Sequence, residues 1–303
     1  MIQSKGGTEI LHETLMRKLD NNDLQGINLF LNGLSENMLK SDQINILWNH
    51  HSYDQPAVQA YRNNELLNKV QYFVYVSNWQ YEKYRYHFQI PENRSLVIRN
   101  AIQSIELKEK QKKIRLIYTS TPWRGLDVLL DAFSLLDRDD VELDVYSSTI
   151  IYGSQFHDEN EKYYKALFQR AESMKNVNYY GYASNEDIRE ALLRAHVFAY
   201  PCTWEETSCL SAIEAGMAGL NLVTTNLGAL YETVNTWGRL VSYDSNKLNL
   251  AKKFAFALNR AIDEFWSEET QLRLQEQHVY YKKFYSWDYR IIEWKNFLSQ
   301  LRK

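Results

Sequence analysis

Apolar runs alternate with amphipathic segments along most of the chain. The apolar runs predict β-strands at Ile27–Leu31, Ile44–Trp48, Tyr72–Ser77, Leu96–Ile98, Ile114–Tyr118, Val141–Tyr146, Asn178–Tyr180, His196–Tyr200 and Asn221–Thr225. The amphipathic or charged segments predict helices at Ile10–Leu19, Val128–Leu136, Tyr163–Met174, Ile188–Ala195, Cys209–Ala218, Leu248–Phe265, Glu268–Lys282 and Ile291–Leu301. This alternation predicts an α/β protein with parallel sheets, in which ligands bind beyond the carboxyl ends of the strands.

The stretch from Ala199 to Val234 carries most of the candidate chemistry. Thr207 and Ser208 have side-chain oxygens of the kind that cap a helix, and they precede its apolar residues. A helix start offers free N–H groups and a positive dipole end, which favour phosphate. Glu206 lies before this point and Glu214 about two turns beyond it, so both carboxylates are suited to accept hydrogen bonds from sugar hydroxyls. The alternative is a packing unit with two solvated glutamates.

The spacing of Glu206 and Glu214 resembles the E-x7-E motif of retaining glycosyltransferases with the GT-B fold, the large family-4 group. Three neighbouring features match as well: the Tyr-Pro that ends the preceding strand, the Glu-Ala-Gly-Met-Ala-Gly that starts at Glu214, and the Gly-x-x-x-Glu from Gly228 to Glu232. The resemblance implies two Rossmann-like domains that face a cleft. It also implies that Glu206 holds the donor sugar, Glu214 holds the ribose, and Gly228 belongs to a segment that closes the donor pocket.

Gly6 and Gly7 precede the first predicted helix. Paired glycines let a backbone approach a ligand closely, although a plain loop explains them equally well. They resemble the Gly-Gly-x-Glu of the same transferases, whose loop faces the donor diphosphate. Those enzymes have a β-strand before this loop, whereas five residues precede Gly6 here. We therefore expect an abbreviated N-terminal domain.

His50 and His51 follow the second predicted strand. Taken alone they fit ordinary loop histidines. Transferases of this group carry a histidine that faces the sugar at the same strand end, and either His50 or His51 matches it. We expect no metal, because no further cluster of ligands accompanies these side chains.

The resemblance also divides the chain. Val97–Ile102 resembles the hinge between the two domains, with Ala101 in place of a glycine, and a charged linker follows it. We expect an N-terminal acceptor-side domain over residues 1–103 and a C-terminal nucleotide-sugar domain over residues 104–285. An Ser-Trp pair precedes the last predicted helix, which implies that residues 286–303 cross back onto the N-terminal domain.

The resemblance also implies further residues that contact the nucleotide-sugar donor. Arg124 could reach a diphosphate bidentately or be a solvated loop residue, and the resemblance assigns it to the phosphates. Gly181 and Tyr182 match the segment that lines the base pocket, although Tyr182 also fits a core residue at a strand end. The expected donor-binding residues are Gly6, Gly7, Arg124, Gly181, Tyr182, Glu206, Thr207, Ser208, Cys209, Leu210, Glu214 and Gly228, and the expected catalytic residues are Glu206, Arg124 and His50 or His51.

The composition limits the kinds of partner and compartment that fit this chain. A hydrophobic content of 45% is enough for packed cores, and a net charge of -3 gives no general reason to bind nucleic acid. It also gives no support to a DNA-modifying transferase. Cys202 and Cys209 fit small buried residues of a reducing compartment. No apolar run reaches about 18 residues, so we expect a cytoplasmic protein.

These observations predict a retaining transferase that moves a sugar from a UDP- or GDP-sugar to a hydroxyl of a glycan, lipid-linked or protein acceptor. No cofactor other than this donor is expected, and a homo-oligomer is left open. Two alternatives remain: a nucleotide-sugar-binding or scaffolding protein of the same fold with weakened catalysis, and a sugar-nucleotide epimerase.

Overall fold

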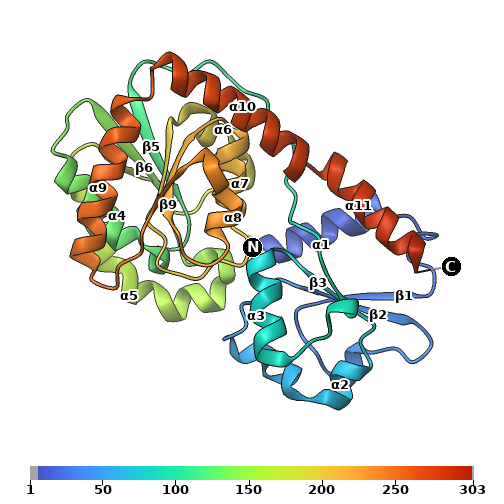
Figure 1. Cartoon of the computed structure of the whole chain (residues 1–303). Helices are drawn as coiled ribbons and strands as arrows, with labels where there is room; N and C mark the ends of the chain where they lie inside the picture. Colours follow the sequence, from blue (N-terminus) through green and yellow to red (C-terminus); the bar gives the residue numbers. More distant parts are fainter. Residues whose placement is uncertain (1–5, 302–303) are drawn as a thin grey trace.

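A computed structural model describes residues 6–301 and contains two parallel sheets, each with its own helices (Figure 1). The N-terminal sheet has four strands in the order β1-β2-β3-β4: β1 (Ile27–Leu31), β2 (Ile44–Asn49), β3 (Tyr72–Tyr75) and β4 (Ser95–Val97). Every neighbouring pair in it is parallel. The predicted α/β class with parallel sheets is therefore confirmed.

The second sheet has six strands in the order β10-β9-β8-β5-β6-β7. These are β5 (Ile114–Thr119), β6 (Val141–Tyr146), β7 (Val177–Tyr179), β8 (Val197–Tyr200), β9 (Asn221–Thr225) and β10 (Arg239–Val241), and their pairs are again parallel. The strand order reverses beside β5 and β8, which is where ligands bind in open sheets of this kind. The loops after β5 and β8 carry Arg124 and Glu206.

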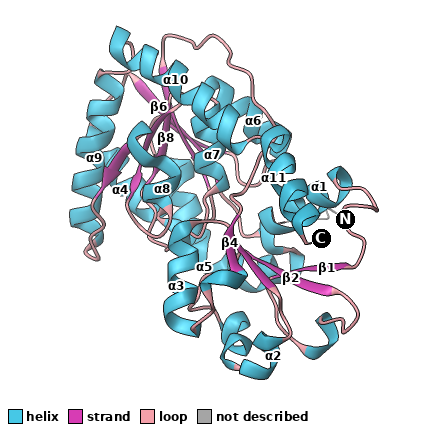
Figure 2. Cartoon of the chain, turned by 45° about the vertical axis from the view of Figure 1, so that its right-hand side comes forward, coloured by secondary structure: helices cyan, strands magenta, loops and turns pink. Residues whose placement is uncertain are grey.

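Helices cover both sheets (Figures 1 and 2). The N-terminal sheet is accompanied by α1 (Gly7–Lys18), α2 (Asn64–Asn68) and α3 (Asn78–Phe88). The second sheet is accompanied by α4 (Leu126–Leu136), α5 (Ser154–Ser173), α6 (Asn185–Arg194), α7 (Leu210–Met217), α8 (Leu230–Val234), α9 (Lys247–Asp263) and α10 (Glu268–Tyr285). Short 3₁₀ turns connect several of these elements, among them Pro122–Arg124 before α4.

The last helix, α11 (Trp287–Gln300), lies beside α1 at the N-terminal sheet (Figures 1 and 2). Its Trp294 and Leu298 are fully buried in one apolar cluster with Leu15 of α1. At the crossing, the Ile102 N–H donates to the Tyr285 carbonyl at 2.8 Å, and the Trp287 N–H donates to the Ile102 carbonyl at 3.2 Å. The two chain segments that connect the sheets are thus tied to each other.

Several elements differ from the sequence prediction: α2, α8 and β10 were not predicted, and two longer helices differ as well. The helix α5 begins at Ser154 and not at Tyr163. The sequence prediction missed its first turns, because they are polar and carry no apolar stripe. The helix α3 was not predicted, since aromatic and charged residues fill it without a clear apolar face. A local signal was present: the Ser77 hydroxyl accepts from the Gln80 N–H at 3.1 Å, and the Gln80 side chain accepts from the Val76 N–H at 2.9 Å. This resembles a capping box and marks a helix start.

Candidate functional site

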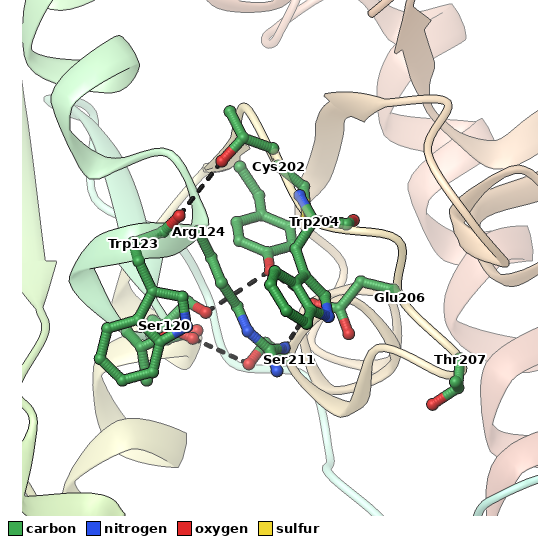
Figure 3. Close-up of polar contacts among 12 residues, drawn as sticks. Ser120, Trp123, Arg124, Cys202, Trp204, Glu206, Thr207 and Ser211 are labelled. Carbon is green, nitrogen blue, oxygen red and sulfur yellow. Dashed lines mark hydrogen bonds and ion pairs between the residues drawn. The ribbon is translucent and has the colours of Figure 1, made fainter. Parts of the chain in front are cut away.

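The loop after β8 brings Glu206 to Arg124 (Figure 3). Glu206 is 5% exposed, and its Oε1 accepts from Arg124 Nη1 at 2.6 Å and from the Tyr200 hydroxyl at 2.5 Å. Burial raises the pKa of Tyr200 well above its usual value, so the phenol stays a donor. The expected phosphate-binding cation and the expected sugar-binding carboxylate therefore bind each other in this structure. Their assignments to the donor stay predictions.

The helix α7 does not have the predicted side-chain cap. It begins at Leu210 with Cys209 at the cap position, and no side-chain hydrogen bond caps it. The Thr207 hydroxyl instead donates to the His50 carbonyl oxygen, which follows β2, at 2.9 Å. The prediction of a Thr or Ser cap is wrong, because the helix begins only at Leu210 and Thr207 and Ser208 both precede its cap residue Cys209. The first N–H groups of α7 have no partner within the helix itself.

The first residues of α1 and α7 touch. A Cβ built on Gly7 would lie 2.8 Å from Leu210 Cδ1, so the first residue of α1 packs closely against the leucine side chain that begins α7. Gly6 is the cap residue of α1. Two positive dipole ends from different domains meet at this point, and together they favour an anion more than one alone. We refer to the contact of Gly7 with Leu210 as the helix junction.

His50 and His51 lie beside the helix junction at the end of β2. Both ring nitrogens of His50 are buried and have no hydrogen bond of normal geometry within residues 6–301. Burial and, after it, the neighbouring His51 lower the pKa of His50 to about 3, so its imidazole is neutral. Burial also lowers the pKa of His51, with Glu9 opposing it. The two histidines remain indistinguishable as sugar contacts, but both are available as neutral donor–acceptors.

Glu214 has surroundings unlike those of Glu206. Burial raises its pKa to about 7, and this shift is opposed by the charge of Arg189, whose Nε lies 4.0 Å from Glu214 Oε1. Arg189 belongs to α6, which follows the loop of Gly181 and Tyr182. Gly181 has a φ of +66°, and Tyr182 is 39% exposed. Tyr182 is therefore not the core residue that one interpretation of the sequence allowed.

Gly228 packs on the backbone of the Glu206 loop. It has a φ of +59°, and a Cβ there would lie 2.4 Å from both the backbone N and O of Glu206. The Ala229 N–H donates to the Glu206 carbonyl at 2.7 Å. The segment from Gly228 thus supports the loop that carries the first glutamate of the motif.

Glu232 makes a contact that the sequence did not predict. Its carboxylate accepts from the Trp79 N–H at 2.7 Å and from the Asn78 N–H at 3.1 Å, both in the first turn of α3. Arg99 Nη2 lies 3.4 Å away. Glu232 therefore stabilises the start of a helix in the facing domain. We refer to this contact as the Glu232 bridge.

The two cysteines are free and buried, as predicted. Within residues 6–301, no group of three or more His, Cys, Asp or Glu side chains is arranged to hold a metal ion. The same part of the chain has no helix that combines the length and apolar character needed to cross a bilayer.

Residues 97–279 match the family model described as "Glycosyl transferases group 1". That range is more than half of the 303 residues. The chain belongs to this family.

A relative of this member of the group 1 family is an "Uncharacterized 41.2 kDa protein in cps region" of Klebsiella pneumoniae. The two are 25% identical over 199 residues, which is 60% of this chain and 49% of the relative. The chain thus matches about half the length of that relative.

Solved structures give the fold. A glycosyltransferase from Rickettsia africae ESF-5 superposes with a TM-score of 0.72 at 14% identity and covers 100% of this chain and 84% of its own. Anabaena Alr3699/HepE, solved with UDP and glucose, superposes with a TM-score of 0.65 at 14% identity, covering 86% of this chain and 71% of its own. These likenesses, together with the two parallel sheets, establish the GT-B fold expected from the sequence.

Proposed function

We propose that this group 1 protein transfers a sugar from a nucleotide-diphosphate sugar to an acceptor hydroxyl. The observation that carries the proposal is the helix junction, where two helix starts from facing domains meet. Such a point suits a diphosphate without a metal. The ring nitrogens of the neutral His50 are buried without a hydrogen bond of normal geometry, with Asn100 as a polar neighbour, and a sugar hydroxyl would give them a well-aligned partner. We also propose a division at residues 103 and 104, with residues 286–303 belonging to the N-terminal side.

Roles follow from the geometry. Both contacts to Glu206 use Oε1, so we assign Oε2 to the hydroxyls of the transferred sugar. Glu214 is half-buried and its Oε1 lies 4.0 Å from the Arg189 Nε, and we assign it to the ribose hydroxyls. Arg124 remains our assignment for the phosphates, with Glu206 holding its guanidinium in place.

The proposed chemistry retains the anomeric configuration. The bond from the anomeric carbon to the phosphate oxygen breaks while the acceptor oxygen bonds on the same face, and the acceptor proton passes to the departing phosphate oxygen. Stabilising the negative charge on that phosphate is then the main contribution of the protein. Helix starts and Arg124 would supply it. The anomeric configuration of the product, observed by NMR, tests this step; inversion would contradict it.

Donor binding is tested by thermal unfolding against UDP, GDP, ADP, TDP and their common sugars. UDP leads the panel, because neighbours of this fold were solved with UDP, among them Alr3699/HepE. A ligand at a hundred times its Kd adds about 2.7 kcal/mol to the free energy of unfolding. We expect one nucleotide family to stabilise the protein, and Glu214→Ala to abolish the effect. The matched control is Glu276→Ala in α10, an exposed carboxylate far along the chain.

A nucleotide-sugar-binding protein with weakened catalysis is the second candidate. The Arg124–Glu206 ion pair favours it, because the guanidinium is already neutralised by a carboxylate. The two functions differ in turnover: a transferase hydrolyses or transfers its donor, whereas a pure binding protein is stabilised by the donor and leaves it intact. An epimerase would convert the donor sugar to its epimer, which the same chromatogram detects.

A further inference from the structure

A pocket of about 490 Å³ lies where the chain crosses between the two domains. Its lining comes from the start of α3, from Arg99 after β4, from α8 and the residue that follows it, and from the α10–α11 crossing. Neither Arg124, Glu206 nor Glu214 lines it. The volume is within the range of small-molecule sites, about 300–1,000 Å³. The pocket is thus built by both domains and is distinct from the helix junction.

Aromatic rings form much of the lining. They are Tyr231, Tyr280, Phe284, Tyr285 and Tyr289. Three of them keep large exposed surfaces: Tyr231 is 50% exposed, Tyr289 44% and Phe284 37%. Aromatic faces pack against the C–H faces of sugar rings, while phenol hydroxyls and the amides of Asn78 and Asn235 can hydrogen-bond sugar hydroxyls.

Two arginines and two glutamates line the pocket, so their formal charges cancel. Arg290 pairs with Glu293, and Arg99 lies 3.4 Å from Glu232. No surplus of cations is left among these groups to neutralise a phosphate, which argues against a nucleotide. Arg290 is only 4% exposed, and its Nε is buried without a hydrogen-bond partner in the described chain. The pocket therefore favours an uncharged, hydroxyl-rich ligand over a phosphate-bearing one.

We propose that this pocket binds a neutral saccharide as a second carbohydrate site. Because residues of both domains line it, a bound saccharide favours the domain arrangement in which the Glu232 bridge is formed. The inference does not require sugar transfer by the protein. Its failure and the failure of the proposed function are therefore separate outcomes.

The experiment measures binding of maltotriose, lactose and N,N′-diacetylchitobiose to the full chain by saturation-transfer NMR. The variants are Tyr231→Ala and Tyr289→Ala, whose half-exposed rings contribute little to the core. The control is Tyr163→Ala in α5, where the ring is 71% exposed and does not line the pocket. We expect at least one probe to bind and its affinity to fall at least tenfold in both pocket variants, with Tyr163→Ala unchanged.

Circular dichroism melting curves check that each variant is folded, and a competition with UDP separates the two sites. Retained saccharide binding in the presence of saturating UDP supports the inference. Absence of binding by all three probes, equal affinity in wild type and both pocket variants, or displacement by UDP would each overturn it. If the saccharide binds but UDP does not stabilise the protein against thermal unfolding, the pocket assignment stands and the proposed donor site is contradicted.

Discussion

The two glutamates of the E-x7-E motif occupy opposite surroundings. Glu206 is buried with an arginine at 2.6 Å and a tyrosine hydroxyl at 2.5 Å. Glu214 is half-buried, with the Arg189 Nε 4.0 Å from its Oε1, and desolvation raises its pKa to about 7. A carboxylate that is already paired with an arginine helps to hold its own loop in place. A carboxylate without a close cation gains more binding free energy from a ligand that donates hydrogen bonds to it. We therefore expect Glu206 to act mainly on the stability of the fold, and Glu214 to change its protonation state when a ligand binds.

The largest effect is expected for Arg124→Ala. It leaves the Glu206 carboxylate buried without its guanidinium, and loss of one partner of a buried pair costs about 3–5 kcal/mol. Urea unfolding measures the change in the free energy of unfolding. The double variant Arg124→Ala, Glu206→Gln should recover part of the loss, because no charge remains unpaired. A single variant as stable as wild type would show that the pair does not support the loop.

The second prediction concerns pH. Since the folded pKa of Glu214 is raised from 4.5 to about 7, the folded state keeps the proton longer than the unfolded state. Stability from this group is therefore highest below pH 4.5 and falls as the pH rises to 7, by about 3 kcal/mol in all. Glu214→Gln should remove that slope, so its stability relative to wild type increases between pH 5 and pH 8. Chemical unfolding at several pH values measures the difference.

The matched variant Glu276→Gln changes an exposed carboxylate and should leave the slope as in wild type. Ligand binding gives an independent readout. Because ribose hydroxyls prefer the ionised carboxylate, UDP affinity of the wild type should increase as the pH passes 7, and that of Glu214→Gln should not. Parallel pH profiles of the two proteins would contradict the ribose assignment.

A third prediction tests how the Glu206 loop is held. Gly228→Ala places a Cβ 2.4 Å from the backbone of Glu206 at a φ of +59°. Gly26 has a similar φ of +71° but no atom within 4 Å of the built Cβ. Gly26→Ala should lose about 1 kcal/mol from backbone strain alone, and Gly228→Ala about 2 kcal/mol or more. If thermal unfolding shows equal losses of stability for the two variants, the Glu206 loop moves away from the added Cβ at no cost in free energy.

The sequence prediction was most accurate for the apolar strands. Ile27–Leu31, Val141–Tyr146 and Asn221–Thr225 have the predicted bounds, because buried parallel strands are continuous apolar runs bounded by turns. It predicted α3 not at all and α5 only from Tyr163, because polar and aromatic turns have no apolar stripe. Periodicity detects burial on one face and misses helices stabilised by tertiary contacts.

The site shows the same limit. The motif spacing pointed to Glu206 and Glu214, but spacing does not give their partners. Arg124 and Glu206 are 82 residues apart in sequence, and Glu232 and Asn78 are 154 apart. Pairings over such separations depend on how the sheets pack. The difference between a compensated and an uncompensated glutamate is therefore a property of the fold.

The smallest effect is expected at the third carboxylate, Glu232, which accepts from two helix N–H groups and has the Arg99 Nη2 at 3.4 Å. Glu232→Gln keeps an oxygen acceptor for the Trp79 N–H but removes the charge at the start of α3, which is worth about 0.3–1 kcal/mol. Stability should fall by that amount, and small-angle scattering should show a slightly larger radius of gyration. Glu65→Gln, in the first turn of α2, changes an exposed carboxylate at a helix start and serves as the control. If both variants lose the same stability and neither changes the radius, the Glu232 bridge acts only as a local cap and does not hold the domains together.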